Sequence, residues 1–213
     1  MLTIHHLGRS QSERIVWLCE ELGIPYDLKL HVRDSVTRLS PPELRALHPM
    51  GAAPVIEHDD LTLAESGAIM EYIIAKFGDG RLALAPSHPD YAKYLYWFHF
   101  ANSNLQPVMA RNMLLHRLDL PADHPVKAAT RERLDRALGT LETRLSDATW
   151  LAGDEFTAAD IMIVFTLTTM RLFYPLDLGP WKHTLAYLQR IGARPAYQAA
   201  MKKGDPDLVP MLT

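Results

Sequence analysis

Apolar positions in the first 80 residues switch repeatedly between the spacing of a strand and the spacing of a helix. The run from Leu2 to His6 predicts a short strand. A helix is predicted next, because four apolar residues recur at the i, i+3, i+4 and i+7 positions of one helical face: Ile15, Leu18, Cys19 and Leu22. Gly23 and Pro25 end this helix.

The same alternation continues up to residue 80. Residues 26–31 predict a second strand, and Pro41 with Pro42 predicts the start of a short helix that runs through Leu47. Two apolar segments, 54–57 and 61–63, flank a polar turn and predict a hairpin. A last helix is predicted from a stripe that is followed by glycines: Met70, Ile73, Ile74 and Phe77. The order β-α-β-α-β-β-α predicts helices packed on a small mixed sheet.

Beyond residue 89 the pattern becomes almost entirely helical. The segment 81–89 contains two prolines and predicts a linker. Residues 90 to about 118 predict one long helix with a kink at Pro107, because proline lacks the amide donor. Further helices are predicted from Asp123, from Thr157, over 181–191 and over 196–202. The chain is therefore expected to combine an α/β region with an all-α region.

Composition excludes several classes of protein. The 213 residues are 48% hydrophobic and 22% charged, which is the balance of an ordinary globular protein. A net charge of −3 gives no electrostatic reason to expect nucleic acid or a membrane as partner. No apolar run approaches the ~20 residues that span a bilayer, and the first residues lack the pattern of a signal peptide. We therefore expect a cytoplasmic protein.

Cysteine and histidine usage argues against metal and disulfide chemistry. Cys19 is the only cysteine, so an intrachain disulfide or a cysteine-based zinc site is excluded. It lies on the apolar face of its helix and is interpreted as a core residue. The ten histidines lack ligand spacing, and His5 and His6 are neighbours on a strand, where they point to opposite faces. No metal is expected.

The segment from Phe156 to Ile161 carries the clearest local signal. Thr157 can cap a helix while Asp160 reaches back to the amide of the cap residue, as in a capping box. Phe156 and Ile161 occupy the two positions of a hydrophobic staple. We interpret this segment as a device for folding and stability.

Two serines lie between the first strand and the first helix, in the segment Ser10-Gln11-Ser12-Glu13-Arg14. The first amides of a helix lack internal partners, and the helix dipole adds about half a positive charge there, so this location suits an anion. A serine hydroxyl that donates to a bound thiolate contributes about 1.5–3 kcal/mol. That energy equals roughly one to two pKa units. On this segment alone, the simpler interpretation is that Ser10 or Ser12 only caps the helix.

A third signal joins the segments Gly51-Ala52-Ala53-Pro54-Val55 and Ala64-Glu65-Ser66-Gly67-Ala68. A proline that opens a strand can follow a cis bond, which would turn the amide and carbonyl of Ala53 toward an extended ligand. Glu65 and Ser66 begin a helix whose free amides favour a carboxylate, while Glu65 can pair with an ammonium group. An α-amino acid end carries both charges. The alternative is a turn followed by an ordinary helix start.

Taken together, these motifs resemble the cytosolic glutathione transferases, in particular their serine-type, theta-like bacterial and fungal members. The likeness covers the serine segment with the following 17–23, the loop 48–54, the Glu65-Ser66 pair and the segment 156–161. It implies a thioredoxin-like glutathione-binding domain over 1–80, a linker over 81–89 and an all-helical domain over 90–213. It also implies a homodimer that uses glutathione as co-substrate and no other cofactor.

The resemblance assigns roles to residues of this chain. Ser10, four residues before Arg14, is the expected catalytic partner of the sulfur, and a Ser12→Ala change is expected to matter much less. The backbone of Ala53 before Pro54 is expected to bind the cysteinyl part, and Glu65 with Ser66 the γ-glutamyl end. Many relatives carry a polar residue where this chain has Ala52, so the glycine carboxylate needs another partner. Arg38 is the candidate, with Arg33 and Arg45 as alternatives.

The second substrate is expected to be a hydrophobic electrophile. Its pocket is predicted at four residues, of which the methionines adapt to varied shapes: Leu7, Met109, Arg111 and Met113. The expected function is conjugation of glutathione to electrophiles in detoxification, with glutathione peroxidase activity as a possible second reaction. Two alternatives stay open. One is a binding or regulatory protein of the same fold with little catalysis, and the other is a family member with a dedicated dehalogenase or isomerase role.

Overall fold

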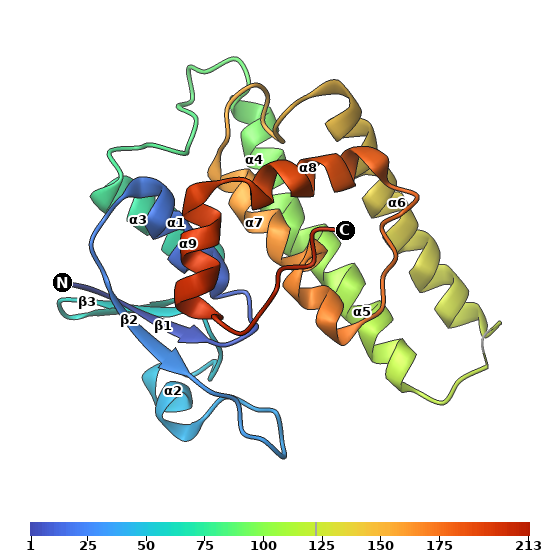
Figure 1. Ribbon diagram of the computed structural model, residues 1–213, viewed down its shortest axis with the longest axis horizontal. Helices are drawn as coiled ribbons and strands as arrows, with labels where there is room; N and C mark the ends of the chain where they lie inside the picture. The colour runs from blue at the N-terminus through green and yellow to red at the C-terminus, as the bar shows by residue number, and fades with distance from the viewer. Residues whose placement is uncertain (122) are drawn as a thin grey trace. The chain divides into compact units, whose positions relative to one another are not determined.

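A four-stranded mixed sheet organises the first of two compact units (Figure 1). The computed structural model describes residues 1–121 and 123–213. The strands are β1 (Leu2–Leu7), β2 (Asp27–His31), β3 (Val55–His58) and β4 (Leu61–Ala64), in the order β2-β1-β3-β4. β1 and β2 are parallel, whereas β3 is antiparallel to both β1 and β4. The predicted hairpin and the mixed sheet are confirmed.

The helices of this unit begin and end close to where the sequence predicts. They are α1 (Glu13–Leu22), α2 (Pro42–Leu47), α3 (Ser66–Phe77) and α9 (Pro195–Gly204). Gly23 ends α1 in the left-handed conformation, with φ of 64°. A glycine adopts this conformation without the steric cost that a side chain adds.

The two faces of the sheet have different environments because neighbouring strand residues point in opposite directions. His5 bonds to His31 at 3.0 Å and to Glu57 at 2.7 Å, and all three lie on one face by the strand register. His6 instead bonds to Ser12 and Asp205. The predicted separation of the two histidines is therefore confirmed.

α9 packs against α1, although the two helices lie at opposite ends of the sequence (Figure 1). The rings of Trp17 and Tyr197 meet edge to face with centroids 4.8 Å apart. Arg194 donates two hydrogen bonds of 2.7 Å to the carboxylate of Glu21. These contacts place residues 192–210 in the same unit as the sheet.

The second unit comprises residues 84–191 and 211–213 and is helical. Its α-helices are α4 (Tyr91–Phe100), α5 (Gln106–Arg117), α6 (Pro125–Asp147), α7 (Ala158–Leu167) and α8 (Lys182–Gly192), the last of which reaches the unit boundary. The boundaries of these two compact units differ from those of the predicted segments 1–80, 81–89 and 90–213. The boundaries of the predicted segments stay a prediction.

The helix irregularity that was expected at Pro107 lies earlier in the chain. A π-helical segment, Ala101–Leu105, joins α4 to α5, and Pro107 lies in the first turn of α5. A proline ring collides with the carbonyl four residues before it, here that of Ser103, and also leaves that carbonyl without its usual donor. The irregularity therefore falls on the turn that precedes the proline.

The capping box at the start of α7 is confirmed. The Asp160 carboxylate accepts from the amide of Thr157 at 2.9 Å, from the amide of Leu151 at 3.0 Å and from the hydroxyl of Tyr187 at 3.2 Å. Burial raises the pKa of Asp160 to about 6, while these hydrogen bonds act in the opposite direction. Asp160 thus ties α7 to the loop before it and to α8.

Candidate functional site

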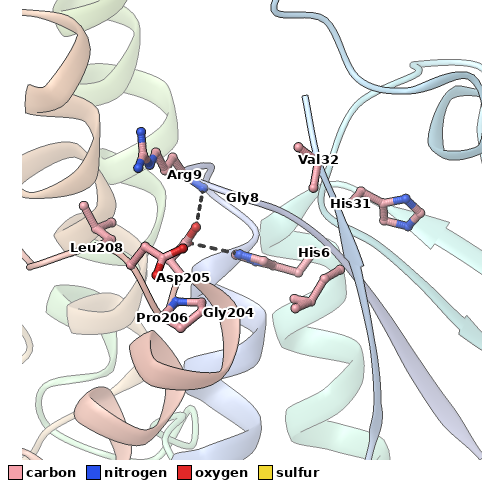
Figure 2. Close-up of a pocket in the computed structure, with 11 residues that line it drawn as sticks. His6, Gly8, Arg9, His31, Val32, Gly204, Asp205, Pro206 and Leu208 are labelled. Atoms are coloured by element: carbon pink, nitrogen blue, oxygen red, sulfur yellow. Dashed lines mark hydrogen bonds and ion pairs between the residues drawn. The ribbon is translucent and has the colours of Figure 1, made fainter. Parts of the chain in front are cut away.

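The turn between β1 and α1 contains the strongest candidates for catalytic residues. The amide of Gly8 donates to the carbonyl of His31 at 3.1 Å. Arg9 has a φ of 55°, a left-handed conformation that costs about 1–3 kcal/mol for a residue with a side chain. Its amide donates to Asp205 at 2.8 Å, and Figure 2 shows the Asp205 carboxylate between this amide and His6. The turn that positions Ser10 is therefore bonded to Asp205, the residue directly after α9.

The two serines of this turn bond to each other just before α1 begins. Their Oγ atoms are 2.7 Å apart, and the amide of Ser12 donates to Ser10 Oγ at 3.2 Å. Ser12 occupies the cap position, but its side chain makes no cap hydrogen bond to the first turn of α1. Both serines are buried. The interpretation as a simple side-chain cap is therefore wrong for Ser12, whereas for Ser10, whose hydroxyl accepts from an amide at the helix start, it stays open.

Residues 10–14 connect three motifs of the predicted glutathione site: the serine segment itself, the segment 51–55 and the segment 64–68. Gln11 donates to the carbonyl of Ala53 at 3.4 Å. Arg14 donates to Gln11 at 3.1 Å and to the hydroxyl of Ser66 at 3.3 Å. Segments that lie more than 40 positions apart in the sequence thus meet around residues 10–14.

The second of these motifs contains a cis peptide bond, and the third contains a helix start without a side-chain cap. The Ala53-Pro54 bond is cis, and both residues are buried. Glu65 is exposed, with φ of 71°, directly before α3, while Ser66 is buried at its first position. No side chain caps α3. Its first amides and the Ser66 hydroxyl are the groups that a carboxylate needs there.

Arg14 supplies a buried positive charge behind Ser66. The side chain is inaccessible to solvent, and burial lowers the pKa of Arg14 to about 9, while the neighbouring Glu13 acts to raise it. At neutral pH the guanidinium is still charged. A ligand carboxylate near Ser66 would therefore be attracted by this cation in a region of low dielectric constant.

Sequence reasoning gave no site role to Gln11, Arg14, His6 or Asp205. Arg14 had a detectable signal, because it is a charged residue directly before the apolar stripe that begins at Ile15. No sequence signal indicated the pairing of His6 with Asp205, because the two residues are 199 positions apart.

The three arginines proposed for the glycine carboxylate lie in different places. Arg38 is exposed in a loop, where its carbonyl accepts from Arg33. Among the hydrogen bonds of the described residues, none joins the Arg38 side chain to the three motifs. Arg45 lies on α2 against Gly51, because a Cβ added there would lie 3.4 Å from its side chain. Of the three, Arg45 is thus the one in contact with the loop that leads to Ala53.

The residues predicted to line the pocket for the second substrate lie in two units and differ in their exposure. Leu7 is 2% exposed and packs in a small core with Leu44, Val55 and others. Met109 is fully buried within the second unit, whereas Arg111 is exposed. Two residues that are two positions apart on a helix point about 200° apart. Met109 and Arg111 thus face different directions, and a pocket formed by all four residues, Met113 included, stays a prediction.

Other site types find no support in the described part of the chain. Among residues 1–121 and 123–213, no group of three or more His, Cys, Asp or Glu side chains is arranged to hold a metal ion. No helix in these ranges has the length and apolar character needed to cross a membrane. Burial raises the pKa of the Cys19 thiol, which argues against a reactive thiolate at that residue.

Comparison with known protein families gives matches in both units. The family described as "Glutathione S-transferase, N-terminal domain" matches residues 9–76, and "Glutathione S-transferase, C-terminal domain" matches residues 100–195.

Individual proteins agree with these family matches. "Glutathione S-transferase 3" of Schizosaccharomyces pombe is 31% identical over 95% of this chain and 88% of its own. A crystal structure of a glutathione S-transferase from Actinobacillus pleuropneumoniae is 31% identical, with a TM-score of 0.87 over 96% of this chain and 93% of that one. "Probable elongation factor 1-gamma 1" of Arabidopsis thaliana is 29% identical over 78% of this chain but only 40% of its own.

Proposed function

Given that the chain belongs to the glutathione S-transferase family and acts as a glutathione transferase, we propose that Ser10 holds the sulfur of glutathione. The observation that carries the proposal is the meeting of three motifs around residues 10–14. Gln11 and Arg14, on either side of Ser12, bond to Ala53 and Ser66. A ligand that follows these contacts would lie across Ser10.

The reaction follows from the chemistry of the thiol. An ionised sulfur is the nucleophile, and a hydroxyl that donates to it favours the ionised form. The thiolate attacks an electrophilic carbon, a carbon–sulfur bond forms, and the electron pair passes to a leaving group or into a conjugated acceptor. We propose a hydrophobic electrophile as the second substrate, with reduction of hydroperoxides as a possible second reaction. Met113 and Arg111 remain candidates for contact with it.

The rest of glutathione is assigned to groups already described. The backbone of Ala53, held before Pro54, pairs with the cysteinyl part. Ser66 and the first amides of α3 receive the γ-glutamyl carboxylate, with the Arg14 cation behind them, and Glu65 receives the ammonium group. Arg45 replaces Arg38 as the first candidate for the glycine carboxylate, since it packs against Gly51.

We further propose a homodimer in the cytoplasm. Leu95 and Tyr96 of α4 are 36% and 51% exposed beside the buried Trp97, and such apolar side chains are typical of an interface. The net charge of −3 gives no reason to expect nucleic acid as a partner.

The rival function is that of a binding or regulatory protein, since a protein named as an elongation factor is among the relatives. Fold alone does not separate the two. Titration calorimetry with glutathione, followed by a spectrophotometric assay with an aryl halide electrophile, does. We expect binding in the micromolar to millimolar range and turnover that requires the enzyme. Absence of binding at several millimolar glutathione would refute the assigned site, and binding without turnover on a panel of electrophiles would favour the rival.

A further inference from the structure

A continuous line of hydrogen bonds leads from Ser10 to a buried carboxylate. Ser10 Oγ lies 2.7 Å from Ser12 Oγ, which lies 2.9 Å from His6 Nδ1. His6 Nε2 lies 3.1 Å from Asp205 Oδ2 (Figure 2). His6 and Ser12 are completely buried. This line of hydrogen bonds therefore connects the histidine to the proposed position of the sulfur through the protein interior.

The fold allows the histidine and the carboxylate to approach because two glycines leave room. A Cβ at Gly204 would lie 3.1 Å from His6 Nε2, and a Cβ at Gly8 would lie 3.2 Å from Asp205 Oδ1. Either contact is tighter than side chains normally accept. The amide of Arg9 also fixes the second oxygen of Asp205 at 2.8 Å.

The direction of the hydrogen bonds follows from the carboxylate. An ionised Asp205 only accepts, so His6 carries its proton on Nε2 and presents Nδ1 as an acceptor. The Ser12 hydroxyl then donates to Nδ1, a shorter contact than the 3.4 Å to the carbonyl of Leu7. Ser12 Oγ in turn accepts from the amide of Leu7 at 3.1 Å and from the Ser10 hydroxyl. Before glutathione ionises, the Ser10 proton therefore points toward Ser12.

We propose that this line is a proton relay, in which the thiol proton of glutathione passes through Ser10 and Ser12 to His6. The inference rests on the proposed function, because it requires the sulfur to lie at Ser10. Neither Ser12, His6 nor Asp205 touches glutathione, so all three are positioning residues that act through Ser10.

The transfer balances in atoms and charge. The thiol gives its proton to Ser10 Oγ, Ser10 gives its own to Ser12 Oγ, and Ser12 gives its own to His6 Nδ1. The products are a thiolate and an imidazolium, with both serine hydroxyls neutral. Each bond then runs in the opposite direction, so that Ser10 donates to the thiolate.

The charge of the Asp205 carboxylate supports this endpoint. The Asp205 carboxylate holds the Nε2 tautomer and stabilises the imidazolium, as a carboxylate beside a catalytic imidazole does in general. Among the described groups, Arg33 lies near enough to Asp205 to interact with it electrostatically. Glu13 begins α1 next to Ser12.

The test measures where the proton goes. Calorimetric binding of glutathione in buffers of different ionisation enthalpy counts the protons released, and S-methylglutathione, which has no thiol proton, gives the background. Ultraviolet absorbance measures the bound thiolate in the same samples. At pH 7 we expect the wild type to release well under one proton for each thiolate formed.

His6→Asn keeps an oxygen that can accept from Ser12 but cannot take up a proton. We expect its thiolate to form only at higher pH, with one proton released for each thiolate, and kcat/KM at pH 7 to fall about tenfold, equivalent to one pKa unit. Asp205→Asn is expected to change the proton count in the same direction. His5→Asn, a buried neighbour on the opposite face of the sheet, is the matched control and should keep the wild-type count.

Two outcomes have different meanings. A wild-type protein that releases one proton per thiolate, while Ser10→Ala still shifts the thiol titration, overturns the relay and leaves the proposed site intact. If Ser10→Ala leaves the titration unchanged, the proposed position of the sulfur fails and the relay fails with it. Urea unfolding of each variant establishes that the measured protein is folded.

Discussion

Replacement of Ser10 by alanine tests the centre of the site. The hydroxyl is buried and bonds only within the turn, so its loss removes the proposed donor to the sulfur without removing a proposed contact to the rest of glutathione. We therefore expect affinity for the thiol form of glutathione to stay near that of the wild type, and the pKa of the bound thiol to rise.

The size of the rise follows from the bond that is lost. A hydrogen bond to a charged group contributes about 1.5–3 kcal/mol. At about 1.4 kcal/mol for each pKa unit, the thiol titration and the rate–pH profile should move up by roughly one to two units. The amide of Ser12 also loses its acceptor, at 3.2 Å, which should lower the free energy of unfolding by about 1–3 kcal/mol.

The assay is the ultraviolet absorbance of bound thiolate against pH, together with the pH dependence of kcat/KM. Ser146→Ala, an exposed serine in the last turn of α6, is the matched control and should leave both curves in place. A Ser10→Ala curve that coincides with the wild-type curve would refute the assigned role. The amides and dipole of α1 would then be left to hold the thiolate.

Four further outcomes are expected. Ser66→Ala should raise the KM for glutathione more than it lowers kcat, because the γ-glutamyl end is remote from the sulfur; an unchanged KM would remove Ser66 from the site. Asp160→Ala removes the acceptor of the buried amides of Leu151 and Thr157 and should lower the free energy of unfolding in urea by roughly 3 kcal/mol, with Asp160→Asn closer to wild type; equal losses would argue against this account. Burial and His5 lower the pKa of His31, against the opposing effect of Glu43, so the unfolded chain binds the proton more tightly and stability falls as pH drops below the ordinary histidine range. His31→Asn should flatten the fall between pH 7 and 5, and an equally steep fall would contradict the assignment. Light scattering should give twice the mass of one chain, and Tyr96→Asp should shift it toward one, whereas a wild-type monomer would contradict the proposed interface.

Local patterns were sufficient to predict most of the fold. The stripe from Ile15 to Leu22, the glycine after it and the prolines at the start of α2 each have their physical cause in a few neighbouring residues. The irregularity was predicted at Pro107 itself, but the π-helical segment lies in the preceding turn. The sequence identifies the proline, whereas the proline disturbs the turn before it.

The candidate site was only partly predictable, because some of its contacts join segments that are distant in the sequence. Ser10, Ala53 and Ser66 belong to local motifs, and each could be singled out from its neighbours. The bonds from Gln11 to Ala53 and from Arg14 to Ser66 depend on how the segments pack. The structure also changes the expectation for Ser12→Ala, since Ser12 is bonded to both Ser10 and His6 rather than serving as a cap.

The position of Asp205 depends on a match between two helices. α1 and α9 are ten residues each. Arg194, before α9, bonds to Glu21 near the end of α1, and Asp205, after α9, bonds to the amide of Arg9 before α1 begins. The helices are therefore antiparallel and joined at both ends. One added residue in α9 would turn Asp205 by about 100° and move it about 1.5 Å along the axis, which would break its bond to His6. The C-terminal helix, assigned from the sequence to the helical domain, thus determines the surroundings of Ser10, and the proposed thiolate site at Ser10 depends on residues at both ends of the chain.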